Sequence, residues 1–213
     1  MKTLEASNGQ VASETSTALV VQLRPILIQR IQIRLVGDSA LICNRWSEKA
    51  KKQMLDKQMK KARSAKEAKN PKEQYRESLY RLPGKLGSGK LGVGYGFPAI
   101  GFKSAAVEAC SHIDGITKVL ARGAFHVVGD LVKIEGTPRM REDMVRVGMG
   151  VADIRYRGEF PTWACTIEVR YNANVLSAEQ IINLFNTAGF AIGVGEWRPQ
   201  RDGSYGMFHV EAH

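Results

Sequence analysis

The feature that most constrains the fold of this sequence is a strand followed closely by a capped helix near the C-terminus. Apolar side chains occupy every second position from Trp163 to Tyr171. This period of two is typical of a strand with one buried face. Ser177 and Gln180 then form a capping box, which predicts the start of a helix, and Gly189 is a suitable end for it. The segment commits this part of the chain to a sheet with a helix packed against it.

Other segments extend this pattern in both directions. Residues 26–36 alternate between apolar and basic or polar side chains, which predicts a strand with one buried face. A helix is expected over residues 103–113, and strand character over 124–134, 190–194 and 207–210. Together these elements predict an α+β domain with helices on one face of an antiparallel sheet. We assign residues 25–213 to this single domain and residues 1–24, which begin with a polar Ser/Thr-rich stretch, to a flexible N-terminal arm.

The positive charge of the chain is concentrated in one segment. The 213 residues carry a formal charge of +10, and residues 45–90 contain fifteen Lys or Arg against five Asp or Glu. The rest of the chain is therefore neutral. A local basic excess of this size indicates an acidic partner such as nucleic acid.

Residues 45–95 are predicted to form an insertion that projects from the domain. Residues 47–69 favour a lysine-rich helix with a thin apolar stripe, which Asn70 and Pro71 end. Residues 84–96 contain six glycines and are interpreted as a flexible loop. Within them, GKLGSGK matches the start of a phosphate-binding loop, but Leu91 stands where a magnesium-binding Ser or Thr is required, so a glycine-rich linker is favoured.

Two groups of side chains are candidates for contact with a nucleic acid. In the first group, lysines and one arginine of the insertion would hold phosphates, and Lys103 would lie at a helix start, where the helix dipole also favours an anion. In the second group, an aromatic and two arginines flank a glycine-rich loop and could stack on bases or clamp phosphates. The alternatives are a solvated charged helix for the first group and a core tryptophan in an ordinary hairpin for the second. The candidates are Lys49, Lys51, Lys52, Lys57, Lys60, Lys61, Arg63, Lys103, Trp197, Arg198 and Arg201.

The sequence offers little support for other chemistry. Three cysteines without CxxC spacing argue against a disulfide framework or zinc site and for a reducing compartment. None of the four histidines has metal-ligand spacing, and no nucleophile–base pair is apparent, so we expect no metal, no cofactor and no catalytic residues. No leader or membrane span is evident, and a cytoplasmic location is expected.

Two short motifs are similar to those of a known family. The segment Phe97 to Ala106 resembles the entry to the first helix of RAMP-superfamily proteins, the RNA-binding backbone subunits of CRISPR effector complexes. The segment Gly193 to Phe208 resembles their C-terminal glycine-rich loop and following strand. The resemblance implies a modified ferredoxin-like (RRM-like) fold, RNA binding and helical self-assembly, and the insertion is similar to the finger-like insertions of those subunits.

The leading hypothesis is therefore a non-enzymatic protein that binds single-stranded nucleic acid, with RNA favoured over DNA. Copies of the chain would assemble side by side along the strand as a homo-oligomer, and no membrane is involved. A phage structural or assembly protein is the first alternative, since small phage proteins share this general appearance. A metal-independent ribonuclease that uses a histidine as acid or base is the second.

Overall fold

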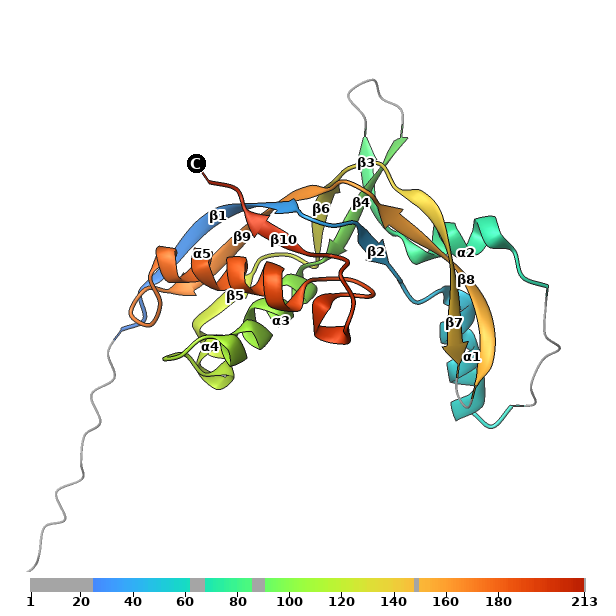
Figure 1. Cartoon of the computed structure of the whole chain (residues 1–213), viewed down its shortest axis with the longest axis horizontal. Coiled ribbons are helices and arrows are strands. Elements are labelled where there is room, and N and C mark those ends of the chain that lie inside the picture. The colour runs from blue at the N-terminus through green and yellow to red at the C-terminus, as the bar shows by residue number, and fades with distance from the viewer. Residues whose placement is uncertain (1–24, 62–67, 86–90, 148–149, 213) are drawn as a thin grey trace, which may run out of the picture.

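The computed structural model describes residues 25–61, 68–85, 91–147 and 150–212. In these residues a seven-stranded antiparallel sheet runs in the order β10-β1-β9-β6-β4-β3, with β5 beside β9 (Figure 1). Its strands are β1 (Ile28–Gly37), β3 (Tyr80–Lys85), β4 (Leu91–Pro98), β5 (Phe125–Val127), β6 (Leu131–Glu135), β9 (Ala164–Asn172) and β10 (Phe208–Val210).

Four of the seven strands follow the ferredoxin-like plan. The chain passes through β1, α3 (Ala99–Ala109), β6, β9, α5 (Ala178–Thr187) and β10, and these strands lie in the order β10-β1-β9-β6. When the elements between them are set aside, each of the two helices lies between strands that are separated by one other strand, as in a β-α-β-β-α-β motif. The predicted α+β, modified ferredoxin-like fold is confirmed by this strand order.

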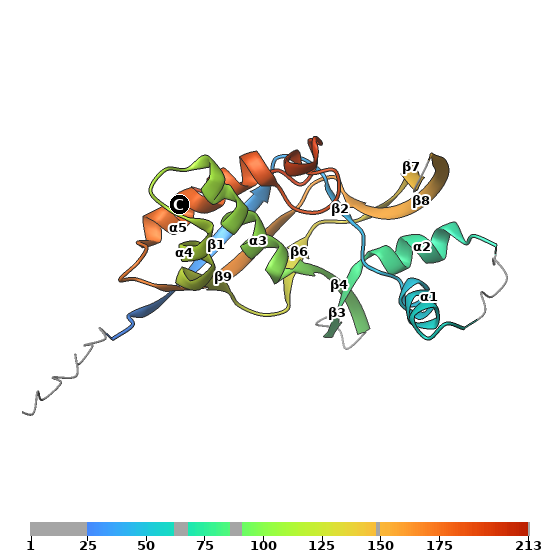
Figure 2. The ribbon, with the colours of Figure 1, turned by 90° about the horizontal axis from the view of Figure 1, so that it is seen from below.

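All helices of this part cover one face of the sheet (Figures 1 and 2). Besides α3 and α5 they include α4 (Lys118–Ala124), and short turns η1 (Cys110–His112), η2 (Ala188–Ile192) and η3 (Pro199–Arg201) follow the longer helices or the glycine loop. The capping box of Ser177 and Gln180 is present at the start of α5. The predicted strand over 190–194 is wrong, because α5 continues into the π-helical turn η2 and the chain leaves it at Gly193 with a positive φ.

The core between helices and sheet is aromatic and apolar. Phe102 is fully buried and makes edge-to-face contacts with Phe97 and Phe208. Trp163 packs on Phe208, and its indole nitrogen donates to the carbonyl of Ser39. We refer below to β1, β5, β6, β9, β10, α3, α4 and α5 as the core region.

Two insertions build a second region beside the core, which we call the basic lobe. It consists of β2 (Leu41–Cys43), α1 (Glu48–Gln58), α2 (Pro71–Ser78), β7 (Arg139–Val147) and β8 (Val151–Phe160). The first three elements leave the core after β1, and the β7–β8 ribbon leaves it after β6. The lobe has its own sheet, in the order β2-β8-β7, and in Figure 2 both helices lie on the same side of the ribbon.

Helix α2 is tied to the outer edge of β8. The hydroxyl of Ser78 accepts a hydrogen bond from the backbone nitrogen of Gly158, and Lys69 donates to the carbonyl of Ile154. A Cβ at Gly158 would lie 2.2 Å from the side chain of Leu79, so only glycine allows this close approach. The two insertions therefore form one packed unit.

Residues 45–95 do not form a separate insertion as predicted. They contain β3 and most of β4, which pair with each other and extend the main sheet beside β6. The loop interpretation of residues 84–96 is wrong for 84–85 and 91–96, which are strand, while 86–90 lie outside the described residues. The polar segment 139–150, for which no element was predicted, contributes strand β7. The N-terminal arm, residues 1–24, also lies outside the described part of the chain.

Candidate nucleic-acid interface

An open cleft of about 990 Å³ lies in the basic lobe, between α1, α2 and β8. Eight basic and four acidic residues line it. The basic ones are Arg45, Lys49, Lys57, Lys60, Lys61, Lys69, Arg155 and Arg157, and the acidic ones are Asp56, Glu73, Glu77 and Asp153. Because the arginines of β8 come from the second insertion, the cleft collects cations that lie about a hundred residues apart in the sequence.

Helix α1 forms because its start is capped and its residues have high helix propensity. The hydroxyl of Ser47 accepts from the backbone nitrogen of Ala50, and Glu48 stands in the first turn, where a carboxylate favours the helix dipole. Helix α1 contains no buried residue. It thus presents its charges to solvent and to the cleft.

The structure divides the predicted lysines of the insertion into two sets. Lys49, Lys57, Lys60 and Lys61 line the cleft. Lys51 and Lys52 belong to the same helix but not to the cleft lining, and Lys51 pairs with Glu48 at 2.9 Å. Arg63 lies outside the described residues. Among the residues that the structure describes, Lys57 and Lys60 have no ion-pair partner, whereas Lys61 pairs with Asp56 at 3.4 Å.

The cleft also contains an aromatic residue that was not among the predicted site residues. Trp46 lines it and is 59% exposed, which is unusual for a side chain of this size. The partly or largely exposed side chains Met54, Ile154 and Tyr156 also line the cleft. The signal was present in the sequence, because Trp46 directly precedes the N-cap of the lysine-rich helix and follows Arg45.

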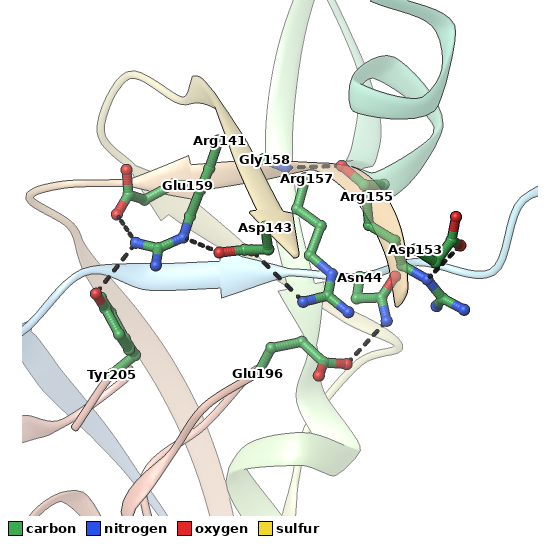
Figure 3. A network of polar contacts seen from close by, with 11 residues as sticks. Asn44, Arg141, Asp143, Asp153, Arg155, Arg157, Gly158, Glu159, Glu196 and Tyr205 are labelled. Carbon is green, nitrogen blue, oxygen red and sulfur yellow. Dashed lines mark hydrogen bonds and ion pairs between the residues drawn. The ribbon is translucent and has the colours of Figure 1, made fainter. Parts of the chain in front are cut away.

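A network of charged side chains on β7 and β8, in which Asp143, Arg157 and Glu159 are buried, includes one residue of the cleft lining, Arg157 (Figure 3). Glu159 accepts hydrogen bonds from Arg139 at 2.6 Å and from Arg141 at 3.0 Å, and Arg141 also donates to Asp143 at 2.7 Å. Although burial opposes ionisation of Glu159, the hydrogen bonds from both arginines and their charges keep its pKa below the ordinary value. Asp143 and Glu159 are both buried, so the lobe holds charged side chains in its interior, whereas the interior of the core contains aromatic rings.

The same network joins the lobe to the C-terminal loop. Arg141 donates to the hydroxyl of Tyr205 at 3.2 Å and lies 4.7 Å from the centre of its ring. Asn44, which lines the cleft, donates to Glu196 at 2.9 Å (Figure 3). Burial opposes the charge of Arg141, but its hydrogen bonds to Asp143, Tyr205 and Glu159 raise its pKa.

The predicted residues of the C-terminal loop do not belong to the cleft lining. Trp197 is 42% exposed at a positive φ, and it is Trp163 that lies in the core. The guanidinium of Arg198 donates to the carbonyl of Gly195 and to Gln200, so it is already engaged within the loop. Arg201 is exposed in η3. Residues 97–106 and 193–200, which come from the two RAMP-like motifs, contribute to a separate small pocket of about 220 Å³ that includes Arg198.

Lys103 lies apart from both groups. Helix α3 begins at Ala99, so Lys103 is in its second turn and not at its start as predicted. Its ammonium group contacts the carbonyl of Arg122 and the Nδ1 atom of His126, both about 3 Å away. Burial lowers the pKa of Lys103. The helix dipole therefore gives no anion site at this position.

His209 contacts Asp38, with 2.6 Å between Nδ1 and Oδ1, and it lies far from His126 in the sheet. His126 is opposite Arg170, which is opposite Arg30 of β1, whereas His209 is opposite Val36. Six residues of strand separate the two positions, or about 20 Å. The three cysteines are buried free thiols, and burial raises the pKa of Cys43 to about 12. In the part of the chain that the structure describes, no group of His, Cys, Asp and Glu could hold a metal ion, and no helix is long and apolar enough to cross a membrane.

Comparisons with known proteins identify likenesses to solved structures. No protein-family model and no curated protein matches the sequence. The crystal structure of Cmr6 from Pyrococcus furiosus is similar over 88% of this chain and 100% of that chain, with 10% sequence identity and a TM-score of 0.41. With a TM-score below 0.5, this likeness adds nothing to what the strand order already shows about the fold.

Proposed function

We propose that this protein binds nucleic acid, and that the cleft of the basic lobe is the interface. The observation that carries the proposal is the convergence of basic residues from α1 and the segments that flank it with arginines from β8 around one open cleft, eight basic residues against four acidic ones. Cations gathered along a hollow attract a phosphate backbone and gain free energy when counterions are released. If the lysines of α1 were only a solvated helix face, there would be no reason for arginines of the second insertion to lie beside them.

An unpaired strand suits the cleft better than a duplex. Trp46 offers an exposed aromatic face beside the lysines, and Tyr156 is partly exposed on β8. Aromatic side chains next to cations bind single strands because unpaired bases stack on the rings while phosphates contact the charges. We extend the proposal to single-stranded nucleic acid on this ground, with RNA as the first candidate.

The open face of the main sheet is a poorer candidate. RRM domains stack bases on aromatic residues of that face. Here β1 and β9 present polar and charged side chains at these positions, and two of the arginines are paired within the chain. Arg30 contacts Glu168 at 2.9 Å, and Arg34 contacts Glu135 at 2.5 Å. Although the fold is RRM-like, we do not propose that bases stack on this sheet face as they do in RRM domains.

The proposal is tested with two double variants on the same helical segment. Lys57→Glu/Lys60→Glu reverses two cations of the cleft, and Lys51→Glu/Lys52→Glu reverses two that do not line it. We expect the first pair to weaken binding of a labelled oligouridylate at least about tenfold, and the second pair to weaken it much less. Equal losses in both double variants would show that only the overall charge matters and that the cleft is not the interface.

Salt dependence measures the number of phosphate contacts. With about six contacts, the logarithm of the affinity should fall with the logarithm of salt concentration with a slope of about −4. Fluorescence anisotropy of wild type at several salt concentrations gives this slope. A slope near zero would contradict the electrostatic basis of the proposal.

Assembly along the strand and the absence of catalysis belong to the same proposal. Light scattering of the protein with oligouridylates of increasing length should show a stepwise rise in bound copies. Labelled RNA should remain intact during the incubation. Closed rings formed without nucleic acid would favour a structural or assembly protein, and cleavage by wild type would favour a ribonuclease.

A further inference from the structure

Arg157 is a buried arginine whose hydrogen-bonding capacity is largely unused. Its side chain is only 6% exposed, and it lines the cleft. Its Nε and Nη1 atoms are buried and have no hydrogen-bond partner among the described residues. The nearest carboxylate is Asp143, with 3.5 Å between Nη1 and Oδ2, which is longer than the 2.7–2.9 Å usual for charge-assisted hydrogen bonds.

Other arginines donate to both carboxylates near Arg157, but Oδ2 of Asp143, which faces Arg157, is buried without a hydrogen-bond partner (Figure 3). Asp143 accepts from Arg141 at 2.7 Å, and Glu159 accepts from Arg139 and Arg141. The network thus contains three guanidinium groups and two carboxylates. Glu196 accepts from Asn44, and no ion pair joins it to Arg157 within the described residues. The surplus guanidinium is that of Arg139, which is 66% exposed, so the unsatisfied groups inside the protein are the facing atoms Nη1 of Arg157 and Oδ2 of Asp143 together with Nε of Arg157. Buried charged groups without hydrogen bonds are costly.

We infer that Arg157 is the phosphate anchor of the cleft, held by Asp143 in the free protein and transferred to a phosphate group when nucleic acid binds. The inference rests on the proposed function and names the residue that makes the most specific contact. A guanidinium fork matches the oxygens of a phosphate and can donate two parallel hydrogen bonds. The free energy lost when the long contact with Asp143 breaks is small compared with the free energy gained from these two hydrogen bonds. Asp143 is then an internal competitor for the ligand.

The competition can be measured with a double-mutant cycle. The variants are Asp143→Asn, Arg157→Met and the combination of both, and the probe is a labelled oligouridylate. Asn at position 143 keeps an acceptor for Arg141 but removes the charge opposite Arg157. Arg155→Met is the matched control, because Arg155 belongs to the same strand, lines the same cleft and pairs with Asp153.

The changes in affinity expected for these variants differ from those of a residue that only adds positive charge to the cleft. Arg157→Met should weaken binding about tenfold, and Arg155→Met about twofold. Asp143→Asn should tighten binding about threefold in the wild-type background and have no effect once Arg157 is replaced. Should Arg157→Met fail to fold, as its melting curve would show, Arg157→Lys takes its place. That variant retains the charge and loses the fork, and it should weaken binding about fivefold.

The outcomes separate this inference from the proposed function. If Asp143→Asn tightens binding equally with and without Arg157, the effect is long-range electrostatics and Arg157 is not the anchor. The same conclusion follows if Arg157→Met, or Arg157→Lys in its place, costs no more than Arg155→Met. If wild type does not bind the oligouridylate even at low salt, the proposed function itself is wrong.

Discussion

The core region and the basic lobe are stabilised in opposite ways. The core region buries phenylalanines, aliphatic side chains and Trp163 between a sheet and three helices. The lobe shares this apolar burial only through β2 and Phe160, which join the core cluster. Elsewhere it buries the charged residues Asp143, Arg157 and Glu159, and its helix α1 has no buried residue. Apolar burial involves no titrating group, whereas a charge network depends on pH and is weakened by salt screening. The comparison indicates that the core maintains the fold while the lobe holds charges in place for a ligand.

The largest effect is expected for a truncation in the core. Phe102 is fully buried and contacts Phe97 and Phe208 edge to face. Phe102→Ala should reduce the free energy of unfolding by about 3–5 kcal/mol, because it removes a large apolar side chain and leaves a cavity. Urea unfolding followed by circular dichroism measures the change. A loss below 1 kcal/mol would mean that the core is not what maintains the fold.

A smaller effect is expected when the charge network of the lobe is interrupted. Glu159→Gln keeps the shape of the side chain but leaves Arg139 and Arg141 without their shared carboxylate. We expect a loss of about 1–3 kcal/mol, the usual cost of an unpaired buried group. Hydrogen exchange should show it in β7 and β8 and much less in β1 and β9. Uniform exchange across both sheets would contradict independent stabilisation of the two regions.

The lowered pKa of Glu159 also predicts how the stability of the lobe changes in acid. The pKa of Glu159 is lower in the folded protein than in the unfolded chain, so the unfolded chain binds a proton first as the pH falls. Its contribution to stability is therefore present above the ordinary glutamate pKa, near 4.3, and is lost as the pH falls through the folded value. Glu159→Gln should reduce the acid sensitivity of β7 and β8.

The two exposed tryptophans allow the lobe and the C-terminal loop to be compared directly. Trp46→Ala should weaken binding of an oligouridylate by about 1–3 kcal/mol with little change in melting temperature, because the side chain is exposed and available for stacking. Trp197→Ala, outside the cleft lining, should have a smaller effect. Anisotropy titrations of both variants measure the difference. A larger loss in Trp197→Ala would move the interface to the C-terminal loop.

Sequence reasoning was strongest where a residue pattern is local. The alternation of residues 163–171 and the capping box at Ser177 gave β9 and the start of α5, since both depend on neighbours in the chain. The count of charged residues identified the segment 45–90, which supplies the lysines of the cleft, because charge can be read directly from the composition. These local signals were sufficient for the α+β fold class.

The parts that were missed depend on pairing between distant segments. Strand β7 is rich in charged residues and does not look like a strand until Arg141 is placed opposite Arg157 and next to Asp143. The glycines of β4 suggested a loop. In the structure Gly96 allows a close approach to β6, because a Cβ at this position would lie only 3.1 Å from the carbonyl oxygen of Val132. Trp46 and Arg157 could not be assigned to one cleft without knowledge of how the two insertions pack.

The smallest effect concerns a titrating residue at the far side of the core. Burial, and then the charges of Lys103 and Arg170, lower the pKa of His126. The unfolded chain therefore binds a proton near pH 6.5 while the folded protein does so only at lower pH, and stability should rise with pH across that interval. His126→Gln, which cannot be protonated, should flatten the dependence of melting temperature on pH there, and Lys103→Met should reduce it in part. Neither variant should alter binding of an oligouridylate, because neither residue lines the cleft. A loss of binding in Lys103→Met would show that the core region contacts the ligand and that the division of roles between core and lobe is incomplete.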